Sequence, residues 1–468
     1  MVQTLVSKIQ PSPERLRPSS PANDPSREVS GTPAASSTSQ DRAFQPGFLA
    51  LQVRTFALTW LSYSSYYFTR KNLSVCKSRL HDDLGLSMTA LGSIDTLYLA
   101  SYALGMFLSG TLGDRIGARR LLTIGMLGSA AVAVWFGLSS SLLAFALAFS
   151  LNGAFQSTGW PGNVKAMQPF FSQSTRGRVM GLWTTNYQVG GLIATALATY
   201  VLTHYGWRAA FIGPATWVAL IGITIFTLLV ERPEDRGFAP VEPLLAPRPE
   251  ATAAAAAAQP APPEESLLAL FLRMPILWAL GSAYFALKMI RYSLLFWLPY
   301  YLRQHLHYDE AAAGYGSMPF EIGGVIGSIS VGWLSDRYFR TRRLKLSVPL
   351  LFVLGVALLA YQRLGGMSLL VNALVLGVCG FLLFGPDSLL SGTMAQDLGG
   401  RKATARVAGI INGMGSTGAI FSPILVAVIK EHLGWSALFY SFFLLTLLAG
   451  SLLGVAAWLH TNRPQVAS

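Results

Sequence analysis

The stretch Gly110-Thr-Leu-Gly-Asp-Arg-Ile-Gly-Ala-Arg-Arg120 follows the second long apolar segment of the chain. A degenerate copy, Gly332-Trp-Leu-Ser-Asp-Arg337 with further arginines up to 343, follows the eighth. The same acidic–basic turn at equivalent places indicates that one half of the chain repeats the other. Two six-helix halves related by an axis along the membrane normal form a recurrent transporter plan, in which the substrate binds between the halves near the bilayer midplane.

Composition agrees with a membrane protein. The chain has 468 residues, of which 52% are hydrophobic and only 12% are charged. A spanning helix needs roughly 20 predominantly apolar residues. Twelve such segments are predicted: 51–80, 89–112, 120–138, 142–170, 178–202, 207–230, 275–302, 312–335, 346–363, 367–396, 404–430 and 434–459. We therefore expect an all-α membrane protein of 12 transmembrane helices in two pseudo-symmetric six-helix halves.

The polar segments divide this pattern. Residues 1–48 are rich in Pro, Ser and Arg and are expected to form a disordered cytoplasmic tail. The N-terminal half should span 49–231, and a Pro/Ala-rich cytoplasmic linker 232–268. The C-terminal half should span 269–461, and 462–468 should form a short tail.

The formal charge of +13 does not indicate nucleic-acid binding, because the basic residues are distributed by side of the membrane. With both termini cytoplasmic, most loop arginines and lysines lie on the cytoplasmic side, as the positive-inside rule requires. The opposite loops are expected to carry Lys77, Arg79, Arg208, Arg303, Arg363 and Lys430. We expect a multi-pass protein of the plasma or inner membrane.

Cysteine and histidine give no sign of a metal or cofactor. The two cysteines, Cys76 and Cys379, lie in different halves within apolar segments, and the histidines lie at segment ends or in loops. No metal-ligand spacing or disulfide framework results. We expect no cofactor and no metal site.

Two arginines lie inside apolar segments at matching places in the two halves: Arg70 in the first segment and Arg291 in the seventh. A cation at the centre of a spanning helix costs at least about 2.5–3.5 kcal/mol, so such residues are usually functional. Each ends a stripe at i, i+4, i+7, and residues at these offsets share one helix face. The stripes are Tyr63–Tyr67–Arg70 and Tyr284–Lys288–Arg291.

This pattern indicates a site for an anion. The planar guanidinium fork of Arg suits phosphate, since it donates two hydrogen bonds at once. Tyrosine hydroxyls can donate to phosphate or sugar oxygens. Glu321 in the eighth segment and Asp387 in the tenth are expected to compensate part of the buried positive charge. Lys71 points about 100° away from Arg70 and need not share the cavity.

The turn at 110–120 resembles the cytoplasmic loop motif of the major facilitator superfamily, and the copy at 332–337 agrees with it. The resemblance implies that the acidic and basic residues of both turns form charge networks which hold one gate closed. The gating residues would be Asp114, Arg115, Asp336 and Arg337.

Within that superfamily, the segment Tyr63-Ser-Ser-Tyr-Tyr-Phe-Thr-Arg-Lys-Asn72 resembles the signature of the organophosphate:phosphate antiporters. Gly159-Trp-Pro161 and Phe296-Trp-Leu-Pro299 resemble it too. Lys77-Ser-Arg-Leu80 and Arg232-Pro-Glu-Asp235 favour the sugar-phosphate exchanger branch. The resemblance implies exchange of an organic phosphate for inorganic phosphate by a rocking motion, with Arg70 and Arg291 clamping the phosphoryl group.

Two departures bear on the substrate. Bacterial glycerol-3-phosphate members of that family carry a histidine where this chain has Tyr187, and a lysine where it has Met106. Lys288 could restore the missing charge. The hypothesis is a monomeric 12-helix antiporter for a sugar phosphate, such as a hexose phosphate, and inorganic phosphate. The expected substrate-binding residues are Arg70, Arg291, Lys288, Tyr63, Tyr67, Trp160, Tyr187, Gln188 and Tyr284.

Two alternatives stay open. Close relatives of these exchangers act as membrane sensors of external sugar phosphate, and their binding residues would be similar. A facilitator of another organic anion, such as a carboxylate or hexuronate, would also use buried cations. An enzyme is not expected, since no arrangement of nucleophile, metal ligands or nucleotide-binding loop stands out.

Overall fold

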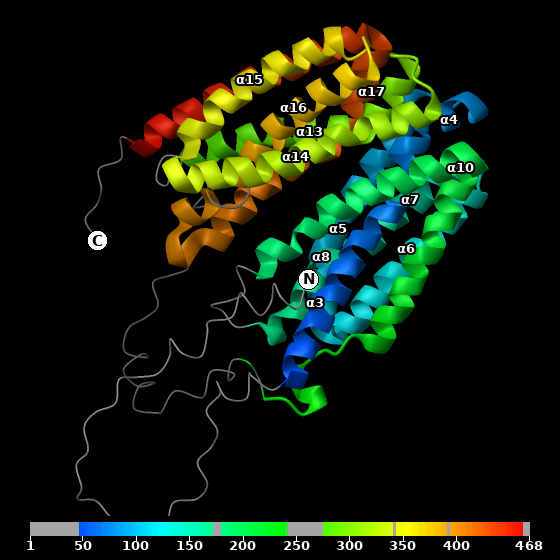
Figure 1. Ribbon diagram of the computed structural model, residues 1–468, viewed down its shortest axis with the longest axis vertical. Coiled ribbons are helices and arrows are strands. Elements are labelled where there is room, and N and C mark those ends of the chain that lie inside the picture. Colours follow the sequence, from blue (N-terminus) through cyan, green and yellow to red (C-terminus); the bar gives the residue numbers. More distant parts are fainter. Residues whose placement is uncertain are drawn as a thin grey trace, which may run out of the picture.

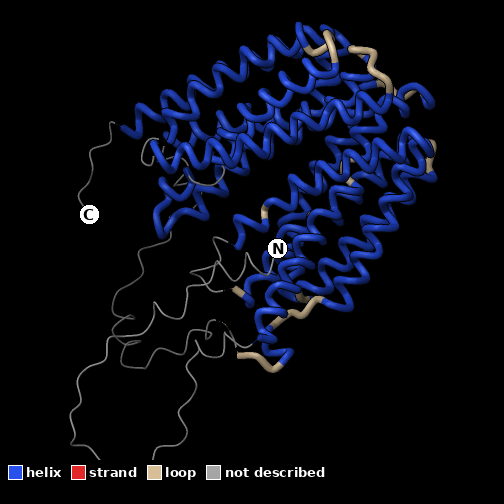
Figure 2. Tube along the Cα trace, viewed as in Figure 1, coloured by secondary structure: helices blue, strands red, loops and turns tan. Residues whose placement is uncertain are grey.

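The computed structural model describes residues 46–171, 179–239, 241, 275–339, 343–390 and 394–461. Within these ranges the fold is helical throughout (Figure 2). The N-terminal half contains α3 (Pro46–Tyr66), η2 (Tyr67–Thr69), α4 (Asn72–Leu84), α5 (Met88–Ile116), α6 (Ala118–Leu138), α7 (Leu142–Gln156), α8 (Gly159–Met167), η3 (Gln168–Phe170) and α10 (Thr185–Leu228). The C-terminal half contains α13 (Pro275–Gln304), α14 (Glu310–Tyr338), α15 (Arg343–Leu364), α16 (Leu369–Ser388) and α17 (Met394–Thr461).

Two of these helices each make two crossings. Gly206 interrupts α10 with φ 81°, and Gly434 has the same φ within α17. Glycine reaches this left-handed region without the steric cost of a Cβ atom, so the chain can reverse there. The two reversals coincide with a further sequence repeat, His204-Tyr-Gly-Trp207 and His432-Leu-Gly-Trp435. With both helices divided, and α3–α4 and α7–α8 each taken as one interrupted crossing, the described helices supply the twelve expected crossings.

By length and composition alone, five described helical segments could cross a membrane: 118–138, 179–228, 343–364, 369–388 and 410–458. α13 is not among them, because Lys288 and Arg291 lower its mean hydropathy. Large apolar side chains are exposed on the helices of both halves, among them Leu108, Leu143 and Ile329. Exposed apolar surface on this scale is the mark of a lipid-facing protein.

The two halves form separate bundles that meet at one end (Figure 1). Between them, α4 packs against α13, α5 against α17, and α10 against α14. Close backbone approach needs small residues, and a Cβ atom on Gly92 of α5 would lie 2.8 Å from the carbonyl oxygen of Pro423 in α17. The halves spread apart toward α8 and the start of α3 (Figure 1).

Polar contacts between the halves lie on the α4 side. Arg79 Nε lies 2.5 Å from Glu310 Oε1, and Gln304 Nε2 donates to Asp82 Oδ1 at 2.9 Å. Thr89 donates its backbone N–H to Glu431 Oε1 at 2.9 Å. This end of the molecule is therefore closed, and we call it the closed end.

The expected placement of Lys77 in an outer loop is wrong. Lys77 lies within α4 and is fully buried, as is its ion-pair partner Asp95 in α5. Its Nζ atom also donates to the carbonyl oxygen of Phe296 at 3.0 Å and lies 3.8 Å from the ring centroid of Trp297. The Asp95 carboxylate, the Phe296 carbonyl and the Trp297 ring thus take the place of the water that would solvate a lysine in a loop.

Residues 1–45 of the predicted N-terminal tail, the predicted C-terminal tail and most of the predicted linker lie outside the described residues, whereas residues 46–48 already belong to α3. The first linker residues are ordered: η4 spans Pro233–Arg236, and the Phe238 ring packs against Phe48 with 5.5 Å between centroids. The start of the linker therefore lies against the start of α3.

Candidate functional site

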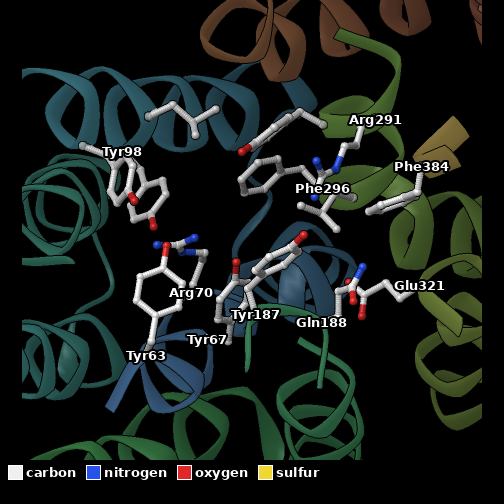
Figure 3. A pocket seen from close by; sticks show the side chains of 14 residues that line it. Tyr63, Tyr67, Arg70, Tyr98, Tyr187, Gln188, Arg291, Phe296, Glu321 and Phe384 are labelled. Atoms are coloured by element: carbon white, nitrogen blue, oxygen red, sulfur yellow. The ribbon is translucent and has the colours of Figure 1, made fainter. Parts of the chain in front are cut away.

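A cavity of about 210 Å³ lies between the two halves and brings the two predicted arginines to one space (Figure 3). The first crossing, α5 and α10 supply one part of its wall, and α13, α14 and α16 supply the other. Its lining residues are Tyr63, Tyr67, Arg70, Tyr98, Leu99, Tyr102, Tyr187, Gln188, Arg291, Tyr292, Leu295, Phe296, Glu321 and Phe384.

Arg70 lies at a break in the first crossing. α3 ends at Tyr66, a 3-10 turn covers residues 67–69, and α4 begins at Asn72. The predicted single helix face is therefore not continuous, yet Tyr63, Tyr67 and Arg70 all still line the cavity. A broken helix at midplane depth is tolerated where it borders a cavity.

The Arg70 guanidinium is surrounded by neutral partners. Its Nε donates to Gln156 Oε1 at 2.9 Å, and its Cζ lies 4.7 Å from the Tyr67 ring centroid and 5.1 Å from that of Tyr102. Aromatic faces attract a cation without neutralising it. In the described part of the chain, no carboxylate forms an ion pair with Arg70.

Arg291 has a different environment. Its Nη1 donates to Asp387 Oδ2 at 2.8 Å, and its Cζ lies 4.3 Å from the ring centroid of Phe384. The carboxylate balances this guanidinium, so the positive charge of the cavity is unequally compensated. Arg70 presents the uncompensated cation.

Five further predicted residues line the cavity or flank it, as Figure 3 shows for those it labels. Tyr187, Gln188 and Glu321 are in the wall. Trp160 is not, but its ring packs edge-on against Tyr63 with 5.8 Å between centroids. Asp387 reaches the site through Arg291.

Lys288 and Tyr284 lie outside the lining of this cavity. Lys288 Nζ lies 5.0 Å from the Tyr284 ring centroid, and both side chains pack against Gly415 of α17. Lys288 therefore faces α17, a neighbouring helix of its own half. The i, i+3 spacing predicts instead that it shares the cavity-facing side of α13 with Arg291. The sequence predicted the helical segments of α17 but not that this face of α13 packs against them.

Glu321 does not compensate either arginine. It forms an ion pair with Lys71, which links the first crossing to α14 beside the cavity. Both side chains are largely buried. The sequence placed Lys71 away from Arg70 but did not identify the acid that it would meet.

Sequence reasoning missed part of the wall. Tyr98 and Tyr102 in α5 line the cavity beside Arg70. Gln156 does not line it but accepts a hydrogen bond from Arg70 Nε. A signal was present: Asp95, Tyr98 and Tyr102 stand at i, i+3, i+7 and so repeat the kind of stripe found at Arg70. Gln156, like Asn152 one turn earlier, is a buried amide in a largely apolar segment, and the cost of burying a polar group marks such a residue as a candidate.

The predicted gating residues lie at the end opposite the closed end. Asp114 is 79% exposed in its side chain and pairs with Lys165 Nζ at 2.5 Å, within the N-terminal half. Arg115 and Arg337 are exposed. The side chain of Asp336 lies outside the described part of the structure. A gating role for these four residues stays a prediction.

No cluster of three or more His, Cys, Asp or Glu side chains suited to a metal ion occurs among the residues described.

Known proteins resemble this chain over most of its length. The family model described as Major Facilitator Superfamily matches residues 59–416. Sugar phosphate exchanger 3 of Homo sapiens is 32% identical over 468 residues, covering 86% of this chain and 93% of the relative. Glucose-6-phosphate exchanger SLC37A2 of Bos taurus is 31% identical over 441 residues, covering 82% of this chain and 89% of the relative.

A solved structure has the same fold. It is a bacterial homologue of the human lysosomal transporter Spinster, in an inward-facing and unoccupied conformation. The TM-score is 0.69 at 14% identity, covering 89% of this chain and 99% of that structure. With two repeated halves, a cavity between them and a family model matching most of the helical region, the chain belongs to the Major Facilitator Superfamily and is a multi-pass membrane protein.

Proposed function

We propose that this protein exchanges an organic phosphate for inorganic phosphate across a membrane by alternating access. Relatives named as a sugar phosphate exchanger and a glucose-6-phosphate exchanger, each similar over most of the chain, support organophosphate exchange. The organic substrate that we propose is a sugar phosphate such as a hexose phosphate. The protein acts as a transporter and not as an enzyme.

One structural observation supports the proposal most directly. Arg70 of the N-terminal half and Arg291 of the C-terminal half line one cavity, and no described carboxylate pairs with Arg70. A buried charge without a counterion is costly, and a bound anion would remove that cost. A phosphoryl group offers enough oxygens to accept from both guanidinium groups at once.

The same geometry suggests how substrate drives the conformational change. The two arginines belong to different halves, so an anion that bridges them favours their approach. An empty cavity leaves the Arg70 charge unbalanced and opposes closure around it. Binding can shift the equilibrium only by the difference in affinity between the two states.

The tyrosines and the amide of the wall suit the organic part of the substrate. Tyr63, Tyr67 and Tyr187 present hydroxyl groups and ring surfaces to the cavity, and Gln188 presents an amide. Such groups donate to and accept from sugar hydroxyls. Trp160 would act through its contact with Tyr63, and Lys288 would supply charge if α13 and α17 move apart.

We place the protein in the plasma or inner membrane as a monomer, with both termini in the cytoplasm. The excess of Lys and Arg in the loops on the side of both termini supports this orientation. The closed end is then the outer end, and the cavity faces inward.

The test is exchange of radiolabelled inorganic phosphate in proteoliposomes loaded with phosphate, followed by competition with a panel of sugar phosphates, carboxylates and hexuronates. We expect phosphate to exchange and sugar phosphates to compete. Organic acids that drive uptake where phosphate does not would overturn the proposal. Wild-type protein that binds sugar phosphate without any counterflow would favour a sensor.

Arg70→Lys tests the clamp, because it keeps the charge but removes the fork. A hydrogen bond to a charged group contributes about 1.5–3 kcal/mol, so the loss of one predicts exchange reduced about 10- to 100-fold. Arg208→Lys is the control, since Arg208 lies outside the cavity and donates to the carbonyl oxygen of Gly137 at 3.0 Å. Wild-type exchange by Arg70→Lys contradicts the clamp.

A further inference from the structure

Gln156 contacts Arg70 outside the lining of the cavity, and its side chain is buried, with the residue 1% exposed. It is the last residue of α7, at the point where the fourth crossing is interrupted before α8. Its Oε1 atom accepts from Arg70 Nε and from the Tyr98 hydroxyl, each at 2.9 Å. Its Nε2 atom donates to the carbonyl oxygen of Tyr66 at 3.1 Å and to Thr69 Oγ1 at 3.0 Å.

These partners fix the orientation of the amide. A guanidinium Nε–H can only donate, and a backbone carbonyl can only accept. The oxygen of the Gln156 amide must therefore face Arg70, and its nitrogen must face Tyr66. A rotated amide would put two donors together at Arg70 and two acceptors together at Tyr66.

The two sides of the amide hold the broken first crossing together. The Tyr66 carbonyl is at the end of α3, where the 3-10 turn begins, and an unpaired carbonyl there would be costly to bury. Gln156 satisfies this carbonyl together with the Thr69 hydroxyl, which donates to it at 3.3 Å, and Gln156 also holds the Arg70 side chain four residues later. One side chain thus links the position of the break to the position of the cation.

The contact at Nε determines which part of the arginine is left for a ligand. With Nε occupied by Gln156, the two terminal Nη nitrogens are the donors that Arg70 can offer to the cavity. The Tyr67 and Tyr102 rings, 4.7 and 5.1 Å from Cζ, restrict the guanidinium from other directions. The fork is consequently held before any anion binds, which lowers the entropy cost of binding.

Gln156 also differs from the partner of Arg291 in charge. Asp387 holds Arg291 and neutralises it, whereas the Gln156 amide holds Arg70 and leaves its charge intact. A carboxylate at 156 would have nearly the same shape and could keep the two acceptor contacts, but it would lose the Nε2 hydrogen bonds to Tyr66 and Thr69 and add a negative charge. The neutral amide therefore preserves the one cation of the cavity that has no described counterion.

We propose that Gln156 is a positioning residue for phosphate recognition: it fixes Arg70 through Nε, directs both Nη nitrogens at the phosphoryl group and keeps the Arg70 charge available. The inference rests on the proposed exchange of organic and inorganic phosphate. It adds that the phosphoryl group meets Arg70 end-on, through the two Nη atoms.

Two substitutions separate positioning from charge. Gln156→Leu keeps the approximate volume but removes the acceptor for Nε. Gln156→Glu keeps this acceptor and adds a negative charge beside Arg70. Both substitutions remove the Nε2 donor, so the difference between them reports the acceptor and the charge. We expect the KM for inorganic phosphate to rise about tenfold in Gln156→Leu, because one hydrogen bond to a charged group is lost. We expect a larger rise in Gln156→Glu, although Arg70 is still held.

The matched control is Gln52, a second buried glutamine, which lies in α3 and does not line the cavity. Its Nε2 donates to the carbonyl oxygen of Phe170 at 2.6 Å, and it is 6% exposed. Gln52→Leu and Gln52→Glu should alter the thermal midpoint by amounts similar to the Gln156 variants. They should leave the KM for phosphate within about twofold of wild type.

Coupling to Arg70 gives a readout that a structural role alone does not change. Phosphate binding to purified protein is measured for Gln156→Leu in the wild-type, Arg70→Lys and Arg291→Lys backgrounds. If Gln156 acts through Arg70, its substitution has little further effect in Arg70→Lys and nearly its full effect in Arg291→Lys. Equal effects in both backgrounds would overturn the inference.

The remaining outcomes are also decisive. Wild-type protein that neither binds nor exchanges phosphate overturns the proposed function and this inference with it. Wild-type exchange with an unchanged KM in both Gln156 variants overturns the inference alone. If Gln156→Leu does not fold, Gln156→Glu decides the question: folded protein with weakened phosphate binding supports the inference, and folded protein with wild-type binding refutes it.

Discussion

Lys71 of the first crossing and Glu321 of α14 form an ion pair that joins the two halves beside the cavity. The two residues are 250 positions apart in the chain, and their side chains are 8% and 12% exposed. Arg70, the neighbour of Lys71, faces the cavity. One short segment therefore presents one cation to the cavity and another to the opposite half.

We expect the charge of this pair to matter more than the identity of its members. Lys71→Glu puts two carboxylates together and should reduce phosphate exchange to less than a tenth of wild type, because breaking a buried pair costs about 3–5 kcal/mol. Lys71→Glu combined with Glu321→Lys should recover much of this loss. Exchange by the double variant that is no better than by Lys71→Glu would contradict a role for the pair. Initial rates in proteoliposomes give the measurement.

Asp387→Asn should make the thermal stability of the protein depend more strongly on bound phosphate. The substitution keeps the shape of the side chain but removes the charge that balances Arg291. We expect a lower thermal midpoint without phosphate and a larger phosphate-induced rise than in wild type, since the anion replaces the missing carboxylate. Asp309→Asn is the control, because Asp309 caps α14 far from the cavity and Asn caps as well as Asp does. An equal phosphate response in wild type and Asp387→Asn would contradict the prediction.

The buried pair of Lys77 and Asp95 should show strong coupling in stability. Both side chains have no exposed surface, so either single substitution leaves a buried charge unbalanced. Lys77→Met or Asp95→Val alone should destabilise by about 3–5 kcal/mol, whereas the double substitution should be closer to wild type. Thermal midpoints of the four purified proteins test this, and additive losses in the double variant would argue against the pair.

Thiol labelling should report the side of the membrane on which each end lies. Cys76 and Cys379 are fully buried, so the wild-type protein should resist a membrane-impermeant maleimide. Asp114→Cys should react in inside-out vesicles and not in intact cells, given the proposed orientation. Asp83→Cys, at the exposed end of α4, should do the reverse. Labelling of Asp114→Cys from outside would overturn the orientation.

The repeated turns at 110–120 and 332–337, together with the apolar segments, sufficed to predict the helical fold of two halves. Arg70 and Arg291 could be chosen as site residues because the cost of burying a cation is a property of the single residue and its apolar neighbours. The stripe rule placed Tyr63 and Tyr67 with Arg70, and they do line one cavity even though the helix is broken between them. It failed for Lys288, which packs against α17 instead.

What local sequence determined is which helix segments form and which buried residues are too polar to be there by chance, since both depend on neighbours within a few turns. Only tertiary packing decided how those residues are paired. Arg70 meets Gln156 across 86 positions, Arg291 meets Asp387 across 96, and Lys71 meets Glu321 across 250. Such pairings depend on which helices pack against one another, and the sequence pattern of a single segment does not specify its neighbouring helix.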